Sequence, residues 1–248
     1  MIKTLLATTT ALTMLAATPG TADIIGMDDA ERAAFRAEVR AYLMENPEVI
    51  LEAVNGLEQR QQAQQAENDL ALVAANAEDI FNDGYSWVGG NPDGDITLVE
   101  FIDYRCGYCR KAHTEVKELL ASDGNIKFIV KEFPILGPDS DASSRFAIAV
   151  KQVAGDEAYG MVHDTLINFK GEASETALRR LSDTMGLDTD AVMAQMGSDA
   201  VSTEIAETRA LAQRLQISGT PTFVLKDDML RGYLPLDAMR QVIAEARS

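Results

Sequence analysis

The sequence predicts an α/β protein in which a block of helices is inserted between two halves of one sheet, and an N-terminal helical segment precedes this domain. Two apolar runs rich in β-forming residues, 96–104 and 125–133, predict the first half of the sheet. Two short runs, 222–225 and 229–232, predict the second half. The sequence between the halves has helical apolar spacing, and this order of strands, helices and strands predicts the fold class.

The first 22 residues have the pattern of a secretory signal peptide. Lys3 supplies a positive charge, residues 5–17 are apolar, and residues 20–22 form a small-residue cleavage site. Because the apolar stretch is shorter than the roughly 20 residues that span a membrane, a retained N-terminal anchor is the less favoured alternative. We therefore expect residues 1–22 to be removed and the remaining chain to be a soluble protein exported to the periplasm.

A helical segment is predicted over residues 23–83. Asp28 and Glu31 match a capping box, and Asn46-Pro47 ends one helix and starts the next. The apolar positions form a narrow, interrupted stripe, so these helices need a partner. We expect the segment to self-associate as a homo-oligomer, with packing on the chain's own domain as the alternative.

The main domain is predicted to cover residues 84–248. A turn signal at 91–94 precedes the first long strand, and a helical pattern over 110–121 separates the two strands of the first half. Short helical patterns that end at Gly, Asp or Ser fill the predicted helical insertion, which covers about 138–216. A helix over 236–246 closes the domain.

The composition excludes some classes of function. The chain has 22 Lys and Arg against 39 Asp and Glu, a net charge of −17, and loss of the signal peptide removes one more positive charge. Without a run of Lys or Arg, such an acidic protein would repel phosphates, so nucleic acid is not an expected partner. The apolar content of 46% is that of a globular protein with a real core.

The sequence contains only two cysteines, Cys106 and Cys109, three positions apart at a strand-to-helix junction. A disulfide that closes so short a loop constrains the unfolded chain little, so the spacing indicates reactivity rather than stapling. At the start of a helix, Cys106 would be an exposed thiolate and the attacking nucleophile. Cys109, one turn later and more buried, would be the resolving cysteine.

Charged neighbours act in both directions on this thiolate. Arg105, Arg110 and Lys111 would favour the anion, whereas Asp103 and Glu100 would oppose it. The sequence does not decide the balance between them.

A metal site and an inert disulfide are the competing interpretations of the cysteine pair. His113 and His163 complete a nominal set of two thiolates and two imidazoles, but their spacing does not match that of zinc fingers. We therefore expect neither a metal nor another cofactor beyond the redox-active Cys106-Cys109 pair. Because two thiolates can bind soft Cu(I), copper handling stays open as a secondary role.

Glu100 stands in an otherwise apolar strand, six residues before the first cysteine. Its neighbours at period two, Leu98, Ile102 and Tyr104, do not form a solvent face. We expect a buried carboxyl group whose pKa is raised by desolvation and which relays a proton to or from Cys109. A charge at a strand edge facing water is the alternative. Another feature, a proline at the start of the strand over 222–225, says little by itself.

Three separated motifs, at residues 99–109, 131–136 and 219–223, resemble those of the DsbA family of the thioredoxin superfamily, and the match covers 84–248. Residues 31–57, with 42–50 as their core, are similar to the N-terminal segment of the ScsC-like (suppressor of copper sensitivity) branch of that family. The resemblance implies a thioredoxin fold with an inserted helical subdomain, and the branch favours oligomerisation through the N-terminal helices.

The resemblance also implies roles for particular residues. It makes Cys106 the nucleophile, Cys109 the resolving cysteine, Glu100 the buried acid and Pro221 a cis-proline beside the sulfurs. Thr220 would present its backbone to an extended substrate segment, a form of strand addition. The substrate would also contact the intervening dipeptide, Gly107-Tyr108.

The resulting expectation is a thiol-disulfide oxidoreductase that acts on cysteine-containing exported proteins and exchanges electrons with a membrane redox partner. Strongly oxidising members carry a His within the intervening dipeptide; Gly107-Tyr108 lacks it, which suggests a weaker oxidant. Oxidase, isomerase and reductase activities stay open, and the helical segment favours the last two. The alternative function is a copper-binding or chaperone-like protein without catalytic turnover.

Overall fold

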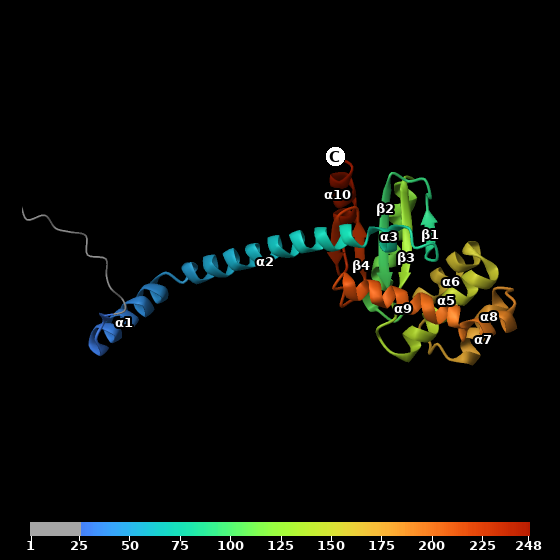
Figure 1. Cartoon of the computed structure of the whole chain (residues 1–248), viewed down its shortest axis with the longest axis horizontal. Coiled ribbons are helices and arrows are strands. Elements are labelled where there is room, and N and C mark those ends of the chain that lie inside the picture. The colour runs from blue at the N-terminus through green and yellow to red at the C-terminus, as the bar shows by residue number, and fades with distance from the viewer. Residues whose placement is uncertain (1–25) are drawn as a thin grey trace, which may run out of the picture. The chain divides into compact units, whose positions relative to one another are not determined.

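The computed structural model describes residues 26–248, and the predicted signal peptide, 1–22, lies outside the described residues. The chain divides into two compact units, of which the first ends at Gln59 and the second comprises Arg60–Ser248. The first unit is blue in Figure 1, and the second runs from cyan to red. Both cysteines belong to the second unit.

Helix α1 (Asp29–Glu45) and the beginning of α2 (Glu48–Ala75) form the described part of the first unit. The predicted capping box is confirmed: the Asp28 carboxylate accepts a hydrogen bond from the Glu31 N–H, and the Glu31 carboxylate accepts one from the Asp28 N–H. The predicted break is also confirmed, because α1 ends at Glu45 with Asn46 as its C-cap residue, and α2 begins at Glu48. The two helices therefore follow the local signals of the sequence.

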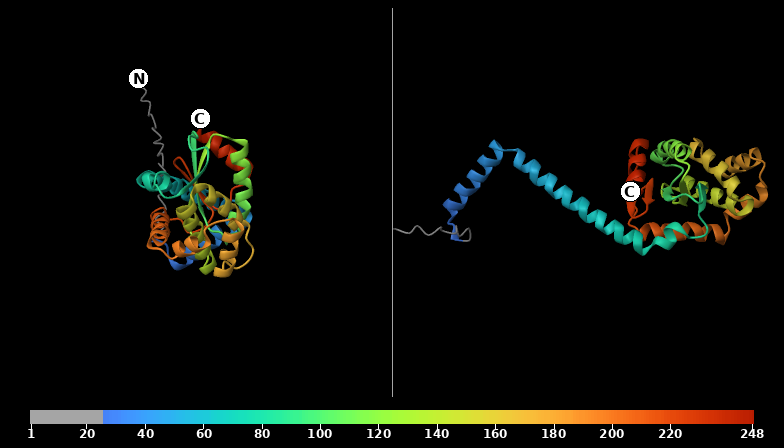
Figure 2. Two further views of the ribbon diagram at one scale, coloured as in Figure 1. Left: turned by 90° about the vertical axis from the view of Figure 1, so that its right-hand side faces the viewer. Right: turned by 90° about the horizontal axis from the view of Figure 1, so that it is seen from above.

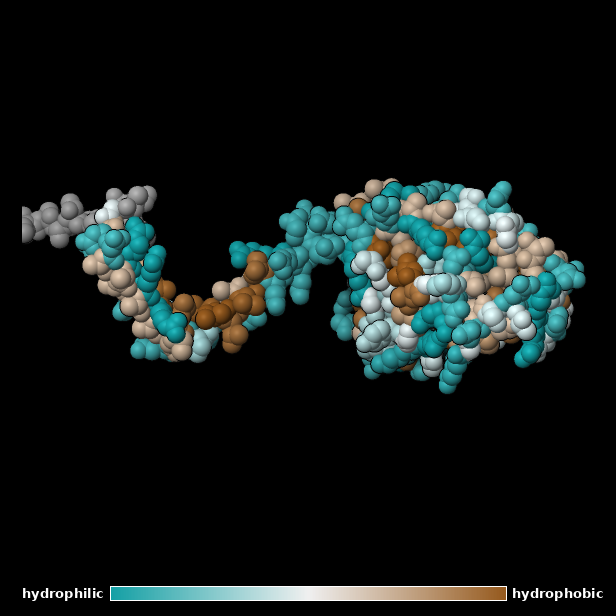
Figure 3. Space-filling view, turned by 90° about the horizontal axis from the view of Figure 1, so that it is seen from below, coloured by the Kyte–Doolittle hydropathy of each residue, from teal (hydrophilic) through white to brown (hydrophobic). Residues whose placement is uncertain are grey.

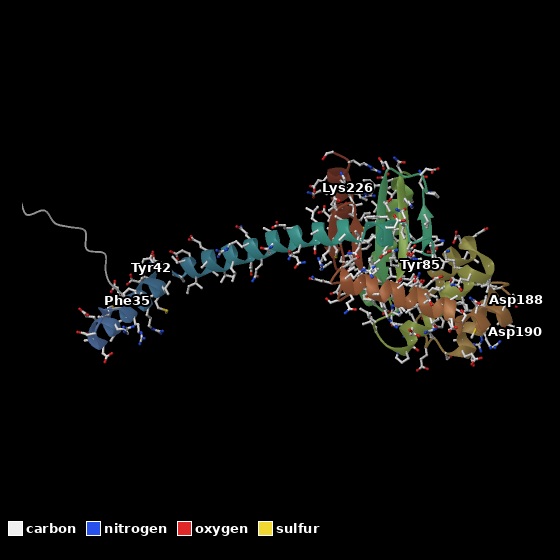
Figure 4. All side chains as sticks on the ribbon, viewed as in Figure 1. Phe35, Tyr42, Tyr85, Asp188, Asp190 and Lys226 are labelled. Carbon is white, nitrogen blue, oxygen red and sulfur yellow. The ribbon has the colours of Figure 1, made fainter. Side chains whose placement is uncertain are left out.

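The first unit exposes its apolar side chains. Among its described residues, 26–59, none is buried. Phe35 and Tyr42 project from α1 (Figure 4), and Figure 3 shows hydrophobic side chains gathered on these helices. The exposed large apolar residues are Phe35, Val39, Tyr42, Met44, Ile50, Leu51, Val54 and Leu57. An exposed apolar surface of this kind is typical of an interaction site.

The second unit is built on a five-stranded sheet with the order β1-β3-β2-β4-β5. The strands are β1 (Trp87–Gly90), β2 (Ile96–Ile102), β3 (Ile126–Glu132), β4 (Thr222–Leu225) and β5 (Asp228–Arg231). Strands β2 and β3 are parallel, and the other neighbouring pairs are antiparallel. The ends of β2, β3 and β5 and the start of β4 therefore lie at one edge, which we call the carboxyl edge of the sheet.

Helices cover both faces of this sheet. Helices α4 (Gly107–Ser122) and α10 (Leu236–Ala246) share one apolar core with alternate residues of β2 and β3. The end of α2, the short α3 (Ala77–Phe81) and α9 (Asp199–Arg214) share a second core with the opposite face. The left view of Figure 2 shows α4 and α10 on one side of the strands and α9 on the other. A sheet covered in this way explains why β2 and β3 are each buried at all but one position.

The helical insertion lies between β3 and β4. Its helices are α5 (Pro138–Ala154), α6 (Asp156–Asn168), α7 (Glu175–Thr184), α8 (Thr189–Met196) and α9. They gather beside the lower end of the strands in Figure 1. The fold class that the sequence predicts is confirmed: a thioredoxin-like α/β sheet interrupted by helices.

The last part of α2 belongs to the second unit and packs on it. Val73 and Ile80 are buried in the second core. Asp69, itself buried, forms an ion pair with Arg231 at the end of β5. For this part of the helical segment, packing on the chain's own domain is the correct alternative.

Candidate functional site

The cysteine motif lies at the carboxyl edge, between β2 and α4. Cys106 is the N-cap residue of α4, which confirms the predicted strand-to-helix placement. Cys106 is less exposed than expected, because only 8% of the residue is accessible to solvent. It is still more accessible than Cys109, of which 1% is accessible. The reason for the low exposure of Cys106 is tertiary, because the loop before β4 reaches over the sulfur, and the Cys106 thiol donates a hydrogen bond to the Thr220 carbonyl oxygen at 3.1 Å.

The pKa of the Cys106 thiol is lowered to about 5. The largest cause is a hydrogen bond with the Cys109 side chain; burial acts in the opposite direction. A hydrogen bond with the Thr220 side chain and the backbone N–H groups of Cys109 and Tyr108 lower the pKa further. The helix start therefore contributes through local N–H groups, as expected for an N-terminal cysteine.

The two thiols are polarised in opposite senses. The pKa of Cys109 is raised well above its usual range, first by the hydrogen bond with Cys106, then by burial and by the charge of Glu100. Both cysteines are free thiols in this structure. The proton in the hydrogen bond between the two sulfurs therefore stays on Cys109, and Cys106 is the sulfur that ionises first.

The cations beside the motif are engaged elsewhere. The Arg105 guanidinium donates to the Gly171 carbonyl oxygen at 2.7 Å, and the Lys111 ammonium lies 4.0 Å from the centre of the Tyr233 ring. Arg110 donates to backbone carbonyl oxygens of its surroundings. None of these cations is among the main causes of the lowered Cys106 pKa. Hydrogen bonds, rather than the charges of neighbouring residues, therefore lower the Cys106 pKa and favour the thiolate.

Glu100 is buried as predicted. It lies in the central strand β2, between β3 and β4, with 3% of the residue accessible, so the strand-edge alternative is wrong. Burial, and to a smaller extent the charge of Cys106, raises its pKa to about 8. Glu100 in turn raises the pKa of Cys109. The buried carboxyl group therefore shares an electrostatic environment with both sulfurs.

The loop before β4 faces the cysteines. The Thr220–Pro221 peptide bond is cis. The Pro221 carbonyl oxygen accepts a hydrogen bond from the Gly232 N–H at 2.9 Å, which ties this loop to the one after β5. The structure thus brings Thr220 and Pro221 to Cys106, from which they are more than a hundred residues distant in sequence.

The dipeptide between the cysteines is open to solvent. Tyr108 is 65% exposed, and its ring stacks on that of Tyr233 with centroids 6.2 Å apart. A Cβ atom added at Gly107 would meet nothing within 4 Å. Both residues can therefore be reached by another molecule at the carboxyl edge.

A buried polar cluster beside the motif was not predicted. The Glu132 carboxylate accepts hydrogen bonds from the hydroxyl groups of Tyr104 and Tyr159 at 2.7 and 2.6 Å. Burial raises the Glu132 pKa to about 7, although these hydrogen bonds lower it. Its neighbour Lys131 is fully buried and pairs with Asp83 at 2.5 Å. The sequence signal for this cluster was the pair of adjacent charged residues, Lys131 and Glu132, in an otherwise apolar strand. Their partners could not be identified because they are distant in sequence.

The histidines join this cluster rather than the sulfurs. The His163 ring lies 5.2 Å from that of His113, and its Nδ1 atom is 3.1 Å from the Tyr104 hydroxyl oxygen. Burial lowers the pKa of His163 to about 3. Within residues 26–248, no group of three or more His, Cys, Asp or Glu side chains is arranged to hold a metal ion. The nominal set of two thiolates and two imidazoles is therefore not assembled.

Comparison with protein families gives two matches. Residues 97–244 match the family described as DSBA-like thioredoxin domain, and residues 31–64 match the Copper resistance protein ScsC N-terminal domain. The first match covers more than half of the chain. Among the described residues, no helix is both long and apolar enough to cross a membrane.

Solved structures with the same fold include oxidoreductases. A thioredoxin-like oxidoreductase from Silicibacter pomeroyi DSS-3 is 39% identical, with a TM-score of 0.64 over 68% of this chain and 96% of that one. The thiol-disulfide exchange protein alpha-DsbA2 from Wolbachia pipientis is 26% identical (TM-score 0.68; 73% and 97% covered). BcfH from Salmonella enterica Typhimurium is 25% identical (TM-score 0.72; 88% and 97% covered).

Some similar proteins are much longer than this chain. The Na(+)/H(+) antiporter NhaA 1 of Salinispora arenicola is 28% identical over 160 residues, which are 64% of this chain and 24% of that protein. The chain thus spans about a quarter of the length of such relatives. By its match over residues 97–244, the chain belongs to the DsbA-like thioredoxin family of thiol-disulfide oxidoreductases, with an N-terminal segment of the ScsC type.

Proposed function

We propose that this protein exchanges thiols and disulfides in exported, cysteine-containing proteins through its Cys-Gly-Tyr-Cys motif. The observation that carries the proposal is the lowered pKa of Cys106, to about 5, at the start of α4. A thiol with this pKa is almost fully ionised at neutral pH, and the thiolate is the form that attacks disulfides. The electrons are carried by the cysteine pair itself, so the reaction needs no bound cofactor.

In the reductive direction, the Cys106 thiolate attacks one sulfur of a substrate disulfide. The substrate S–S bond breaks, a mixed disulfide with Cys106 forms, and one substrate thiolate leaves. Cys109 then loses its proton and attacks Cys106, which releases the second substrate thiolate and leaves the Cys106-Cys109 disulfide. Two electrons pass to the substrate, and its two thiolates take up protons. Oxidation of a substrate dithiol is the reverse sequence.

Glu100 accepts the proton that Cys109 must lose in this sequence. When Cys106 enters a mixed disulfide, its negative charge disappears, and so does the hydrogen bond that raises the Cys109 pKa most. The charge of Cys106 also raises the Glu100 pKa, so its loss favours the Glu100 carboxylate. The first change lowers the Cys109 pKa and favours loss of its proton, and the second leaves Glu100 in the ionised form that can accept a proton at the step that requires it.

The substrate binds as an extended segment along the loop that contains Thr220 and Pro221. Backbone hydrogen bonds to that loop would give affinity without demanding a particular sequence, as in other cases of strand addition. The open positions of Gly107 and Tyr108 leave room for the segment beside Cys106. Such binding fits an enzyme that acts on many exported proteins.

The chain works in the periplasm as a homo-oligomer. The signal-peptide pattern of residues 1–22 supports export, and the exposed apolar side chains of α1 and the first part of α2 support self-association. Several catalytic units on one assembly suit disulfide isomerisation or reduction, with a membrane protein as the electron donor. The reduction potential of the Cys106-Cys109 pair, measured against glutathione, decides the net direction.

Reduction of insulin and reactivation of scrambled ribonuclease test the proposal. The native protein should catalyse at least one of these reactions, and Cys106→Ser should lose it. If the native protein and the variant are equally inactive while both still bind unfolded chains or Cu(I), the protein is a chaperone-like or copper-binding protein without turnover.

A further inference from the structure

Four loops meet at the carboxyl edge of the sheet. The Cys-Gly-Tyr-Cys motif follows β2, and the Thr220-Pro221 loop precedes β4 on one side of it. The loop after β5, which contains Tyr233, lies beyond β4, and the Pro221 carbonyl oxygen accepts a hydrogen bond from its Gly232 N–H. On the opposite side of the motif, the parallel strand β3 ends in the segment 133–137. Cys106 is therefore flanked by a loop from each neighbouring strand.

Asp103 connects the cysteine motif to the segment 133–137. Its carboxylate accepts a hydrogen bond from the Arg105 N–H at 2.8 Å with one oxygen. The other oxygen accepts the N–H groups of Ile135 and Leu136 at 2.8 and 3.0 Å. The Asp103 carbonyl oxygen accepts the Cys106 N–H at 3.0 Å. A fully buried carboxylate thus holds both loops by their backbones.

The segment held by Asp103 exposes two large apolar side chains. Ile135 is 38% exposed and Leu136 is 53% exposed. Their backbone is fixed from a second side, where the Arg209 guanidinium donates to the Pro134 carbonyl oxygen at 2.9 Å. A backbone with three hydrogen bonds cannot readily turn these side chains inward. Exposed apolar groups that are held rigidly at the rim of a site are suited to contact a ligand.

We propose that Ile135 and Leu136 form one wall of the substrate site, across Cys106 from Tyr108 and Tyr233, and that Asp103 is the positioning residue that fixes this wall. The occupant is an extended cysteine-containing segment with apolar side chains next to its cysteine. This inference rests on the proposed function and names its preferred substrates. In an extended segment the two residues that flank the bound cysteine lie about 7 Å apart along the chain, so one of them can lie beside each wall.

Two peptides of equal length test the wall. Each carries one cysteine as a mixed disulfide with a small thiol, flanked by leucine in the first peptide and by serine in the second. The rate constant of exchange with the reduced full-length protein is measured for both. The native protein should prefer the leucine peptide by about tenfold, a ratio typical of one or two apolar contacts. In Ile135→Ser/Leu136→Ser this preference should fall to about twofold or less.

Val153→Ser/Met161→Ser is the matched control. These residues lie in α5 and α6 and are 39% and 49% exposed, close to the values of Ile135 and Leu136. The control removes a similar apolar surface, and its preference for the leucine peptide should equal that of the native protein. Loss of preference in the control would mean that general surface hydrophobicity selects the peptide, which overturns the proposal.

Asp103→Asn tests the positioning role. The asparagine side chain has one carbonyl oxygen, so in either orientation it holds only one of the two loops, and the segment with Ile135 and Leu136 is no longer fixed relative to Cys106. The variant should lose the leucine preference, and combining it with Ile135→Ser/Leu136→Ser should cause little further loss. A merely structural Asp103 would instead slow both peptides equally and leave their ratio unchanged.

The outcomes for the two proposals are distinct. If the native protein exchanges with both peptides at equal rates, or if Ile135→Ser/Leu136→Ser keeps the full preference, the apolar wall is wrong and the enzyme proposal stands. If the native protein exchanges with neither peptide while Cys106 still reacts with a small alkylating agent, the proposed function itself fails.

Discussion

The two units of this chain differ in the burial of their apolar side chains, which form two cores in the second unit and are exposed in the described part of the first. In the second unit, both faces of the sheet are covered by helices, and charged residues such as Lys131 and Glu132 are buried with partners. In the described part of the first unit no residue is buried, and Phe35, Tyr42 and Val54 are exposed. The second unit therefore holds its stabilising contacts within itself, whereas the described part of the first unit leaves its apolar side chains exposed, as is typical of an interaction site.

This contrast separates chemistry from assembly. The groups that set the pKa of Cys106 all lie between Glu100 and Thr220, within the second unit. None of the residues that cause this pKa shift belongs to the described residues of the first unit, 26–59. Changes in one unit should therefore alter exchange, and changes in the other should alter association.

Cys106→Ser should have the largest effect. Without the nucleophilic sulfur, exchange with a disulfide substrate should fall by more than about a thousandfold, because removal of a catalytic nucleophile leaves only binding effects. Stopped-flow reduction of a model disulfide measures this rate. The variant should retain the oligomeric state of the native protein, and a change in that state would contradict the separation of the two units.

Lys131→Ala should destabilise the second unit strongly. The substitution leaves the buried Asp83 carboxylate without its ion-pair partner, which typically costs about 3–5 kcal/mol. Urea denaturation measures the loss in the free energy of unfolding. The double variant Lys131→Met/Asp83→Asn removes both charges and should recover part of that loss. Equal stability of the two variants would show that the ion pair is not the cause.

Val54→Asp/Leu57→Asp should weaken self-association by at least about a hundredfold, because a charge placed in a covered apolar surface is costly. Sedimentation velocity measures the change, and the alkylation rate of Cys106 should stay at the native value. Asn55→Asp/Gln59→Asp adds the same charge on exposed polar positions of the same unit. If the control dissociates as much as the test variant, charge repulsion rather than lost apolar contact explains the result.

Glu100→Gln should change the pH dependence of stability. The folded pKa of Glu100, about 8, lies above its ordinary value of 4.5 because the group is buried. Its contribution to stability is therefore fully present below the ordinary value and is lost as pH rises towards the folded one. Between these two pKa values, the free energy of unfolding should fall by at most about 1.4 kcal/mol per pH unit. Urea denaturation from pH 5 to 8 should lack this loss in Glu100→Gln.

Much of the fold was predictable because its signals are local. The capping box at Asp28, the break at Asn46 and the apolar strand before Cys106 depend on neighbouring residues, and the structure confirms them. The position of Cys109 one turn into α4 follows from the same helix. Local signals also predicted the burial of Glu100, because residues at period two along one strand share a face.

The remaining features depend on which loops the fold brings together. The sequence could not indicate that Thr220 covers Cys106, so the cysteine is less exposed than expected. From the sequence, Asp103 could be interpreted only as a negative charge near Cys106. In the structure its carboxylate accepts backbone hydrogen bonds from two loops. Likewise, the Glu132 carboxylate finds Tyr159 only through the helical insertion. Such partners are tens of residues distant, where periodicity carries no information.

The pKa of Cys106 in the reduced native protein tests the central claim most directly. The rate of alkylation by iodoacetamide, followed from pH 3 to 10, reports the thiolate, while Cys109 is shielded by burial and by its raised pKa. A midpoint near 5 is the expected result. A midpoint near the ordinary thiol value of about 8.5 would contradict the account, because Cys106 would then be no better a nucleophile than a free cysteine.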